Sequence, residues 1–335
     1  MVSDRSLSSR WEGDDGTGLA AQVLTRLVAG EPLDDLGLDR HEDRWDLRGL
    51  AVPDPEIVAT AEVVDASSGD VPPLGVALAS GFLTFRGVGL ADLDLSGARL
   101  QHLRFFDVTL SNCVFEGAAC QDWRGWRLDV EGCSFRNAKL RDAALGTWSE
   151  QRGNRFTDVD FGRADLRGSV WQGAVLVDCD FGEARLDGVE FRACELIRCR
   201  FAGLLDEVRF LGDPSVVIDK PDFGRFEDVD FSGATLRTVE FLDLSLSGIT
   251  FPDESDEQVV VHHYPCVVRR ALELLGDDLS PEVSFLRSTM RADNRRLDDS
   301  REVGVWHVDQ LGDTPESQRN ARELLHRIER ECADG

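Results

Sequence analysis

The chain has 335 residues, of which 42% are hydrophobic and 30% charged, a composition typical of a globular protein rather than a disordered one. Its formal net charge of −26 argues against nonspecific nucleic-acid binding and against attraction to anionic membranes, because both require a positive surface. We find neither a long apolar run nor a basic start followed by an apolar stretch, so we expect no membrane span, no signal peptide and a cytoplasmic location.

The N-terminal region, residues 1–84, opens on a polar, Gly-rich stretch of about sixteen residues that we expect to be mobile. A short helix is predicted next, with Thr17 as N-cap and Gly30 at its end. Its apolar face comprises Leu19, Val23, Leu24, Leu27 and Val28. Trp45 to Leu50 reads as one isolated unit of the repeat described next and is predicted to cap it. Residues 53–73 are predicted to be a linker or a loose strand pair.

A five-residue period governs the chain from Phe85 to Phe251. Large apolar centres recur at Phe85, Leu90, Leu95, Leu100, Phe105, Leu110, Phe115, Phe135, Leu140 and Leu145, then one residue out of register at Phe156, Phe161, Leu166, Trp171, Leu176, Phe181, Leu186, Phe191, Leu196 and Phe201, and finally at Phe226, Phe231, Leu236, Phe241, Leu246 and Phe251. A period of five fits neither a helix nor a simple strand. Each unit must therefore turn a corner.

The residues that flank the centres indicate how the corner is made. Two residues before a centre the side chain is mostly small and apolar, as at Ala98, Cys113 and Ala164. Two residues after it Gly or Asp dominates, as at Asp92 and Gly97. If a short extended piece alternates with a turn, the centre and the small residue both point inward and the Gly or Asp makes the bend. Four such sides close a square.

This pattern resembles the pentapeptide-repeat family, whose usual unit A(D/N)LXX is seen in Ala98-Arg99-Leu100, Ala164-Asp165-Leu166, Ala184-Arg185-Leu186 and Cys179-Asp180-Phe181. The resemblance implies a mainly β fold, a right-handed quadrilateral β-helix over residues 85–251. Four units per coil give about seven coils, and at about 4.8 Å per stacked strand the rod is about 34 Å long. Its interior is expected to be filled by ladders of Phe and Leu alternating with Ala, Val and Cys.

Two interruptions of the repeat predict loops that project from the rod, near residues 146–155 and 211–225. Binding residues tend to lie on loops carried by a rigid scaffold, whereas the simpler interpretation is a tolerated insertion. The candidate partner-binding residues in these loops are Trp148, Glu150, Arg152, Asp213, Val217, Lys220 and Asp222.

Beyond an acidic spacer, residues 252–335 are predicted to form an α-helical subdomain. Pro265 begins one helix that ends at Gly276, Ser280-Pro281-Glu282 caps a second, and Thr314-Pro315-Glu316 opens the last. A weaker helical segment is marked by Val303, Trp306 and Leu311. We expect this subdomain to close the C-terminal end of the rod, and its leftover apolar face to pair with a second copy.

The sequence offers little sign of catalysis or of metal binding. Six of the eight cysteines occupy inward positions of the repeat and are interpreted as buried reduced thiols, while Cys266 and Cys332 lie outside it without a partner motif. His262 and His263 are adjacent, so their side chains point apart on any regular element. Carboxylates of the repeat such as Asp160 are interpreted as turn caps rather than as an acid pair. We therefore expect no enzyme activity and no cofactor.

Two functions remain open, and neither involves direct nucleic-acid binding. The first is a protein-protein interaction scaffold with an unidentified protein partner. The second follows from the resemblance: some family members mimic duplex DNA, occupy the DNA-binding saddle of DNA gyrase and protect against topoisomerase poisons. Residues 85–251 carry 28 acidic and 20 basic residues, whereas about 34 Å of duplex carries about twenty negative charges. Mimicry of DNA would require the acidic residues to collect on one face of the rod. We therefore prefer the interaction scaffold as the predicted function and keep DNA mimicry as the alternative.

Overall fold

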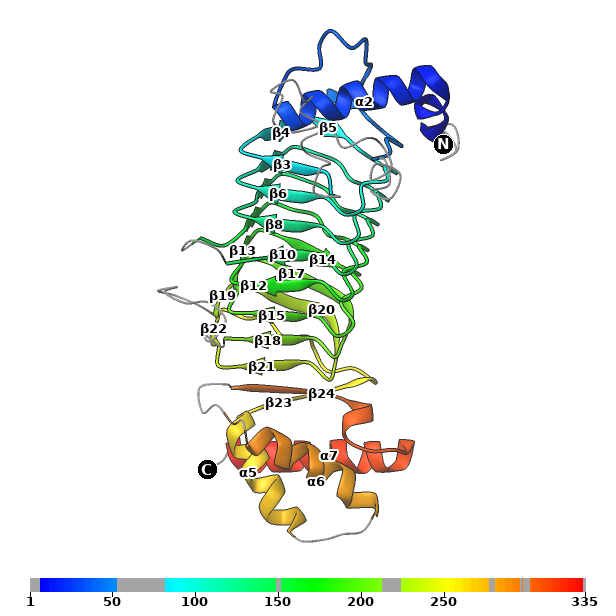
Figure 1. Ribbon diagram of the computed structural model, residues 1–335. Coiled ribbons are helices and arrows are strands. Elements are labelled where there is room, and N and C mark those ends of the chain that lie inside the picture. The colour runs from blue at the N-terminus through cyan, green and yellow to red at the C-terminus, as the bar shows by residue number, and fades with distance from the viewer. Residues whose placement is uncertain are drawn as a thin grey trace.

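The computed structural model describes residues 7–52, 82–148, 152–212, 224–276, 281–295, 297 and 302–333. A rod of stacked strands forms the middle of the molecule, a helix covers one end, and a small unit of helices and two strands closes the other (Figure 1). Within the described ranges no helix has both the length and the apolar character needed to cross a membrane. The predicted β-helix solenoid with C-terminal helices is confirmed.

Two faces of the rod are parallel sheets of eight strands each. The first face consists of β3 (Thr84–Arg86), β6 (Arg104–Phe106), β8 (Arg124–Trp126), β10 (Ala144–Gly146), β12 (Val170–Gln172), β15 (Glu190–Arg192), β18 (Arg209–Leu211) and β21 (Glu240–Leu242). The second face consists of β4 (Gly89–Ala91), β7 (Thr109–Ser111), β9 (Asp129–Glu131), β11 (Arg155–Thr157), β13 (Val175–Val177), β16 (Glu195–Ile197), β19 (Arg225–Glu227) and β22 (Ser245–Ser247). Eight rungs have seven spacings, so a length of about 34 Å follows.

The other two faces are held mainly by single bridges between successive coils. On the third face Asp94, Val114, Ser134, Asp160 and Asp180 form one such ladder. On the fourth face Ala51, Arg99, Ala119, Lys139, Asp165 and Arg185 form another. The regular strands of these faces are β5 (Leu93–Asp94), β14 (Asp180–Gly182), β17 (Arg200–Asp206) and β20 (Asp230–Arg237), and the last two continue from the third face to the fourth.

The corners lie where the Gly and Asp residues predict them. Asp92, Asp107 and Asp178 have φ values of 55°, 56° and 54°, and Gly97 has 65°. This left-handed region is open to Gly and is tolerated by Asp and Asn, which explains the composition two residues after each centre. The chain also places less suited residues there, including Thr238 with φ 56°.

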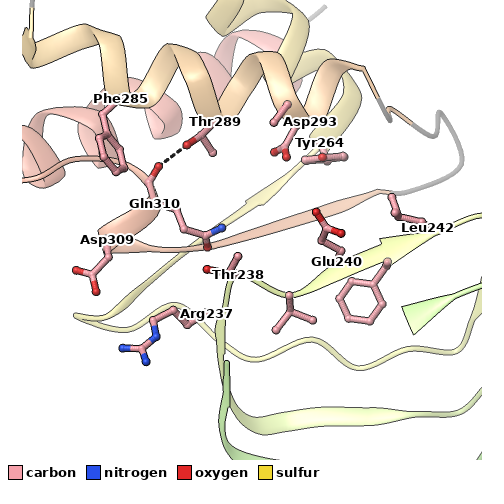
Figure 2. A pocket seen from close by; sticks show the side chains of 13 residues that line it. Arg237, Thr238, Glu240, Leu242, Tyr264, Phe285, Thr289, Asp293, Asp309 and Gln310 are labelled. Carbon is pink, nitrogen blue, oxygen red and sulfur yellow. Dashed lines mark hydrogen bonds between the residues drawn. The ribbon is translucent and has the colours of Figure 1, made fainter. Parts of the chain in front are cut away.

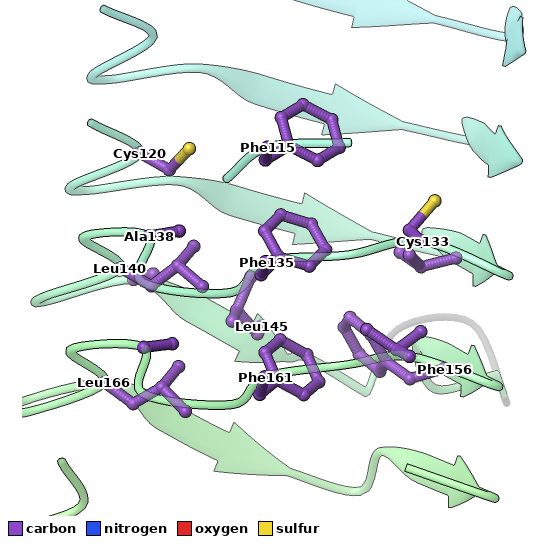
Figure 3. Close-up of a cluster of buried hydrophobic side chains, with 14 of the residues drawn as sticks. Phe115, Cys120, Cys133, Phe135, Ala138, Leu140, Leu145, Phe156, Phe161 and Leu166 are labelled. Carbon is purple, nitrogen blue, oxygen red and sulfur yellow. The ribbon is translucent and has the colours of Figure 1, made fainter. Parts of the chain in front are cut away.

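Aromatic side chains stack along the core from one coil to the next. Phe115 lies 4.7 Å from Phe135 between ring centroids, and Phe135 lies 5.4 Å from Phe161, as Figure 3 shows. The same ladder continues through Phe181 and Phe201, at a centroid distance of 4.8 Å. Offset stacking and nearly complete burial make these rings the main apolar contribution to the core.

Two local changes keep the core filled where the period fails. Gly125 occupies a centre without a side chain, and a Cβ there would meet the side chains of Leu128 and Asn154. Trp123, at the inward position two residues earlier, is fully buried and donates from Nε1 to the carbonyl of Leu100 at 2.5 Å. The unit after Phe201 is one residue shorter than five, so the next inward centres are Leu205 and Phe210. The strict five-residue period ends at Phe201 and does not find them. Eight rungs result.

The N-terminal helix differs from its prediction. η1 (Ser9–Trp11) and α2 (Gly13–Ala29) cover residues 9–11 and 13–16, so most of the expected mobile stretch that the structure describes is helical. The N-cap position is Glu12 rather than Thr17. The cause is tertiary: Trp11 is buried and donates from Nε1 to the carbonyl of Arg48 at 2.8 Å. The helix does end at Gly30, with φ 67°.

The predicted capping unit stacks on the first coil. β1 (Arg40–His41) and β2 (Arg44–Asp46) form a hairpin, and β2 pairs with β5. Asp46 is buried, and its carboxylate accepts from Arg10 at 2.7 Å and from Arg48 at 2.9 Å. Burial acts to raise the pKa of Asp46, but these hydrogen bonds outweigh it and hold the pKa far below its ordinary range. Residues 53–73, predicted as a linker, lie outside the described residues.

The described residues of the C-terminal unit form the α-helices α5 (Tyr264–Leu275), α6 (Pro281–Asn294) and α7 (Pro315–Ala333), which confirms the helices predicted at Pro265, Pro281 and Pro315. The helix predicted around Val303 and Trp306 is wrong. β24 (Val303–His307) is a strand that pairs antiparallel with β23 (Gln258–His262), followed by η3 (Val308–Gln310). Both strands are rich in β-branched or aromatic residues, which favours a sheet over a helix.

Two features of this unit were not anticipated. The buried side chain of Gln258 accepts from the amide of Leu236 at 2.6 Å and donates to the carbonyl of Ala234 at 3.2 Å, so it replaces the next coil's backbone at the end of the rod. Cys266 and Cys332 form a disulfide that joins α5 to the end of α7. Disulfides are uncommon in a reducing cytosol, so this bond does not support the expected cytoplasmic location.

Candidate interaction surfaces

Both predicted loops fall at the same corner of the rod, between a strand of the first face and a strand of the second. The first insertion separates β10 from β11, and the second separates β18 from β19 (Figure 1). Trp148 is half-buried at the base of the first loop. Its ring lies close to Gly153, since a Cβ added to Gly153 would be 3.3 Å from the ring. Arg152 forms an ion pair with Asp129 on the second face. Glu150, Asp213, Val217, Lys220 and Asp222 lie outside the described residues.

A buried amide holds the base of the first loop in the coil. Asn154 is fully buried; its Oδ1 accepts from the amide of Leu128 at 2.9 Å, and its Nδ2 donates to the carbonyls of Gly125 at 3.0 Å and Leu145 at 2.7 Å. These are backbone groups that a regular rung would have paired. The side chain therefore bridges the gap that the insertion leaves in the ladder.

An aromatic–arginine patch, formed by Phe82, Arg86, Arg104, Phe106 and Trp126, covers the first face over its first three rungs. Phe106 stacks on Trp126 at 4.4 Å with an interplanar angle of 2°. The guanidinium of Arg86 lies 4.1 Å from the Phe106 ring, and that of Arg104 lies 4.1 Å from the Phe82 ring. Arg86 is exposed, and Phe106 and Trp126 are half-buried. Such cation–π and ring contacts fix the side chains on a rigid sheet.

The charges divide unequally between the faces. The first three rungs of the first face and their flanking corners carry Arg86, Arg104, Arg124 and Arg127 against Asp107 and Asp122. The Asp122 carboxylate pairs with Arg104 at 2.8 Å and with Arg124 at 2.5 Å. Arg127 and Asp107 form a bidentate pair at 2.5 and 2.6 Å, and this pairing lowers the pKa of Asp107. The second face with its corner carries eight carboxylates against three arginines, namely Asp92, Asp129, Glu131, Asp158, Asp178, Glu195, Glu227 and Asp228 against Arg155, Arg198 and Arg225.

A cleft of about 410 Å³ lies between the last coil and the C-terminal unit, as Figure 2 shows. Its coil side includes Thr238 and Glu240, and its helical side includes Phe285 and Thr289. The Thr289 hydroxyl donates to the carbonyl of Gln310. The residues that line the cleft form no catalytic constellation. Within the described part of the chain, no three His, Cys, Asp or Glu side chains are grouped so that they could hold a metal ion.

The family description "Pentapeptide repeats" matches residues 155–192 in eight copies. These residues form β11 to β15 and the ladders between them, at the centre of the rod. This central part of the rod, residues 155–192, consists of pentapeptide repeats.

Solved structures similar to this chain include proteins of several descriptions. A trypsin-treated form of QnrB1, a plasmid-mediated fluoroquinolone resistance protein, is 16% identical, covers 51% of this chain and 83% of its own, and has a TM-score of 0.28. HetL, a pentapeptide repeat protein involved in heterocyst differentiation regulation from the cyanobacterium Nostoc sp. strain PCC 7120, is 17% identical over 55% of this chain and 98% of its own, with a TM-score of 0.26. No curated protein matches the sequence.

Sequence reasoning missed the aromatic–arginine patch, although its signal is present. Phe106 and Trp126 follow the inward centres Phe105 and Gly125 by one residue, an outward position where other coils carry Arg192 or Gln172. An aromatic residue at an outward position has no packing role in the core. Scoring the outward positions, as well as the centres, would have found it.

Proposed function

We propose that this chain is a non-enzymatic interaction scaffold that holds a protein partner against the aromatic–arginine patch. The observation that carries the proposal is the outward ladder of Arg86, Phe106 and Trp126 on the first face. Trp and Arg are enriched among the residues that dominate binding energy at protein interfaces. On this acidic chain the patch is also a local excess of positive charge, which favours partners with an apolar, acidic contact surface.

The rigidity of the rod supports this assignment. The patch side chains stand on β3, β6 and β8, whose backbones are paired on neighbouring rungs, and their rings and guanidinium groups already contact one another. A partner therefore has little side-chain freedom to remove on binding, which lowers the entropy cost of association. Trp148 and Arg152, at the corner beside the same face, are proposed as secondary contacts.

Affinity capture with three forms of the full chain tests the proposal. The forms are wild type, the Phe106→Ala/Trp126→Ala pair, and the control pair Val175→Ala/Val177→Ala on the second face, whose side chains are also half-buried and outward. We expect one protein, identified by mass spectrometry, to be retained by wild type and by the control but lost by the patch variant. Equal retention by all three forms, with unchanged melting temperatures, would remove the patch from the proposal.

A second candidate, mimicry of duplex DNA at DNA gyrase, is favoured by the acidic second face. Its net of five negative charges is about a quarter of the roughly twenty on a duplex of the same length, so mimicry by this face alone would be incomplete. The test is gyrase supercoiling with and without a quinolone, using wild type and a form in which Asp158, Asp178 and Asp228 are replaced by Asn. Inhibition or protection by wild type that the variant loses would establish this candidate; no effect of wild type would eliminate it.

A further inference from the structure

In the described part of the chain, the backbone that pairs with the first coil of the rod from its N-terminal side belongs to residues 44–52 and reaches two of the four faces. Residues 44–52 pair with the third face through Trp45 and Asp46 and with the fourth face through Ala51. The second face receives no such strand, because β4 is the end of its eight-stranded sheet in the described part of the chain. β4 lies near the end of α2 at the N-terminal end of the rod (Figure 1).

The backbone of β4 presents open hydrogen-bonding groups at this edge. The next coil pairs with Val88, whose carbonyl accepts from Thr109 at 3.1 Å, and with Asp92, whose amide donates to Ser111 at 3.1 Å. Along a parallel strand, the backbone N–H and C=O groups of successive residues point alternately toward one neighbouring strand and toward the other. The N–H and C=O groups of Gly89 and Ala91 therefore face away from β7. Both residues are exposed, and no described residue bonds to these groups. Unpaired edges of this kind are templates for another strand.

A groove of about 370 Å³ runs along this edge. Its apolar lining includes Leu27 from α2, Trp45 from β2, and Leu90 from β4 itself. The Trp45 ring is held in place by Arg40, whose guanidinium lies 3.8 Å from the ring centroid. Three residues of strand span about 10 Å, which is the length of β4. The groove thus offers backbone pairing along one side and apolar contacts along the other.

The rim of the groove is strongly acidic. The connection from α2 to β2 lines it with Glu31 and Asp34. Over residues 31–43 this connection carries six carboxylates against Arg40, namely Glu31, Asp34, Asp35, Asp39, Glu42 and Asp43. Arg26 of α2 pairs with Glu31 at 3.2 Å and with Asp35 at 2.8 Å, so six carboxylates face two arginines and the net charge here is −4. The chain as a whole carries −26. Within about 10 Å, the screening length at moderate salt, such a rim attracts basic side chains and repels acidic ones.

We propose that the edge of β4 binds an extended basic peptide segment of another protein, which adds to the second face as a ninth strand. Its backbone pairs with Gly89 and Ala91, and one apolar side chain enters the groove over Leu90 while its Lys or Arg side chains face the acidic rim. This site is separate from the aromatic–arginine patch, so the proposed peptide binding does not depend on the proposed scaffold function.

The test uses the full chain and a fluorescein-labelled peptide of alternating Lys and Val, with anisotropy as the readout. Ala91→Pro removes the outward N–H without removing a bond to β7, and Ala91→Val is the matched control that keeps it. We expect Ala91→Pro to weaken binding by about tenfold, the effect of losing about one hydrogen bond. Ala91→Val should stay within about twofold, because the backbone donor is retained. A peptide with Glu in place of Lys should bind at least about tenfold more weakly than the Lys peptide.

Binding of the Lys peptide that Ala91→Pro leaves unchanged would be charge attraction alone and would overturn the proposal. Failure of the Lys peptide to bind, or equal binding of the Lys and Glu peptides, would also overturn it. The melting temperature of Ala91→Pro, measured beside that of Ala91→Val, verifies that the rod remains folded. A third form, Ala91→Pro made in the Phe106→Ala/Trp126→Ala background, should bind the peptide as Ala91→Pro does; a further loss would place the peptide on the patch instead.

Discussion

Replacing Asn154 with Ala removes the amide that bridges the coil at the first insertion. Three buried backbone groups, the N–H of Leu128 and the carbonyls of Gly125 and Leu145, then lose their partner. Each unsatisfied buried group costs about 1–3 kcal/mol, and relaxation recovers part of the total. We expect the free energy of unfolding to fall by about 3–5 kcal/mol, a large share of the stability of an ordinary domain.

Urea denaturation followed by circular dichroism measures this loss. Asn320→Ala, an exposed Asn on α7, is the matched control and should change the free energy of unfolding by less than about 0.5 kcal/mol. Asn154→Asp keeps the shape but sets a carboxylate against two carbonyls, so it should destabilise at least as much as Ala. A loss below about 1 kcal/mol for Asn154→Ala would refute the view that this side chain replaces a missing rung.

Four further outcomes are expected. Phe181→Ala should lower the free energy of unfolding in urea by about 3–5 kcal/mol, because the ring is buried between two stacked neighbours; a loss under about 1 kcal/mol would contradict the stacked core. Thr238→Gly should raise stability in calorimetry by about 1 kcal/mol by relieving a β-branched residue at positive φ, and a decrease would count against that strain. A thiol reagent should find no reactive cysteine in the native, unreduced protein, two after mild reduction, Cys266 and Cys332, and all eight after unfolding with reductant. The pKa of Asp46 is lowered on folding, so its stabilisation is complete above the ordinary Asp value near 4 and is lost as pH falls below it; Asp46→Asn should flatten this acid limb in pH-dependent unfolding, and an unchanged limb would disprove the coupling.

The repeat could be predicted because one physical constraint recurs in every unit. An inward Phe or Leu, a small inward neighbour and a corner residue at positive φ leave the same five-residue mark each time. The same logic predicts the buried thiols, and the six cysteines of the repeat are indeed buried. The helices at Pro265, Pro281 and Pro315 were predictable from local cap chemistry, which also operates within a few residues.

Features that depend on contacts between distant segments could not be predicted in this way. The β24 strand exists because β23 pairs with it across an intervening pair of helices. The Cys266–Cys332 bond requires the start of α5 to meet the end of α7, a separation of 66 residues. The period predicts that Trp123 points inward, but not its contacts with Phe105, Phe115 and Phe135, which belong to other units of the repeat.

The candidate site was only partly predictable for a similar reason. The two insertions were located by the loss of phase, but their common corner depends on how many residues each coil contains. Outward residues of the repeat obey no packing rule, so Phe106 and Trp126 stand out only once the faces are known. The acidic bias of the second face is likewise hidden along the chain, because neighbouring pentads belong to different faces.

The most direct test of the scaffold account is site-specific photo-crosslinking in the native host. A benzoylphenylalanine replaces Trp126 on the first face in one form of the full chain and Val177 on the second face in another. We predict that irradiation joins one defined protein to the position of Trp126 and not to that of Val177. The same adduct from both positions, or none from the position of Trp126 while the protein remains folded, would contradict the account.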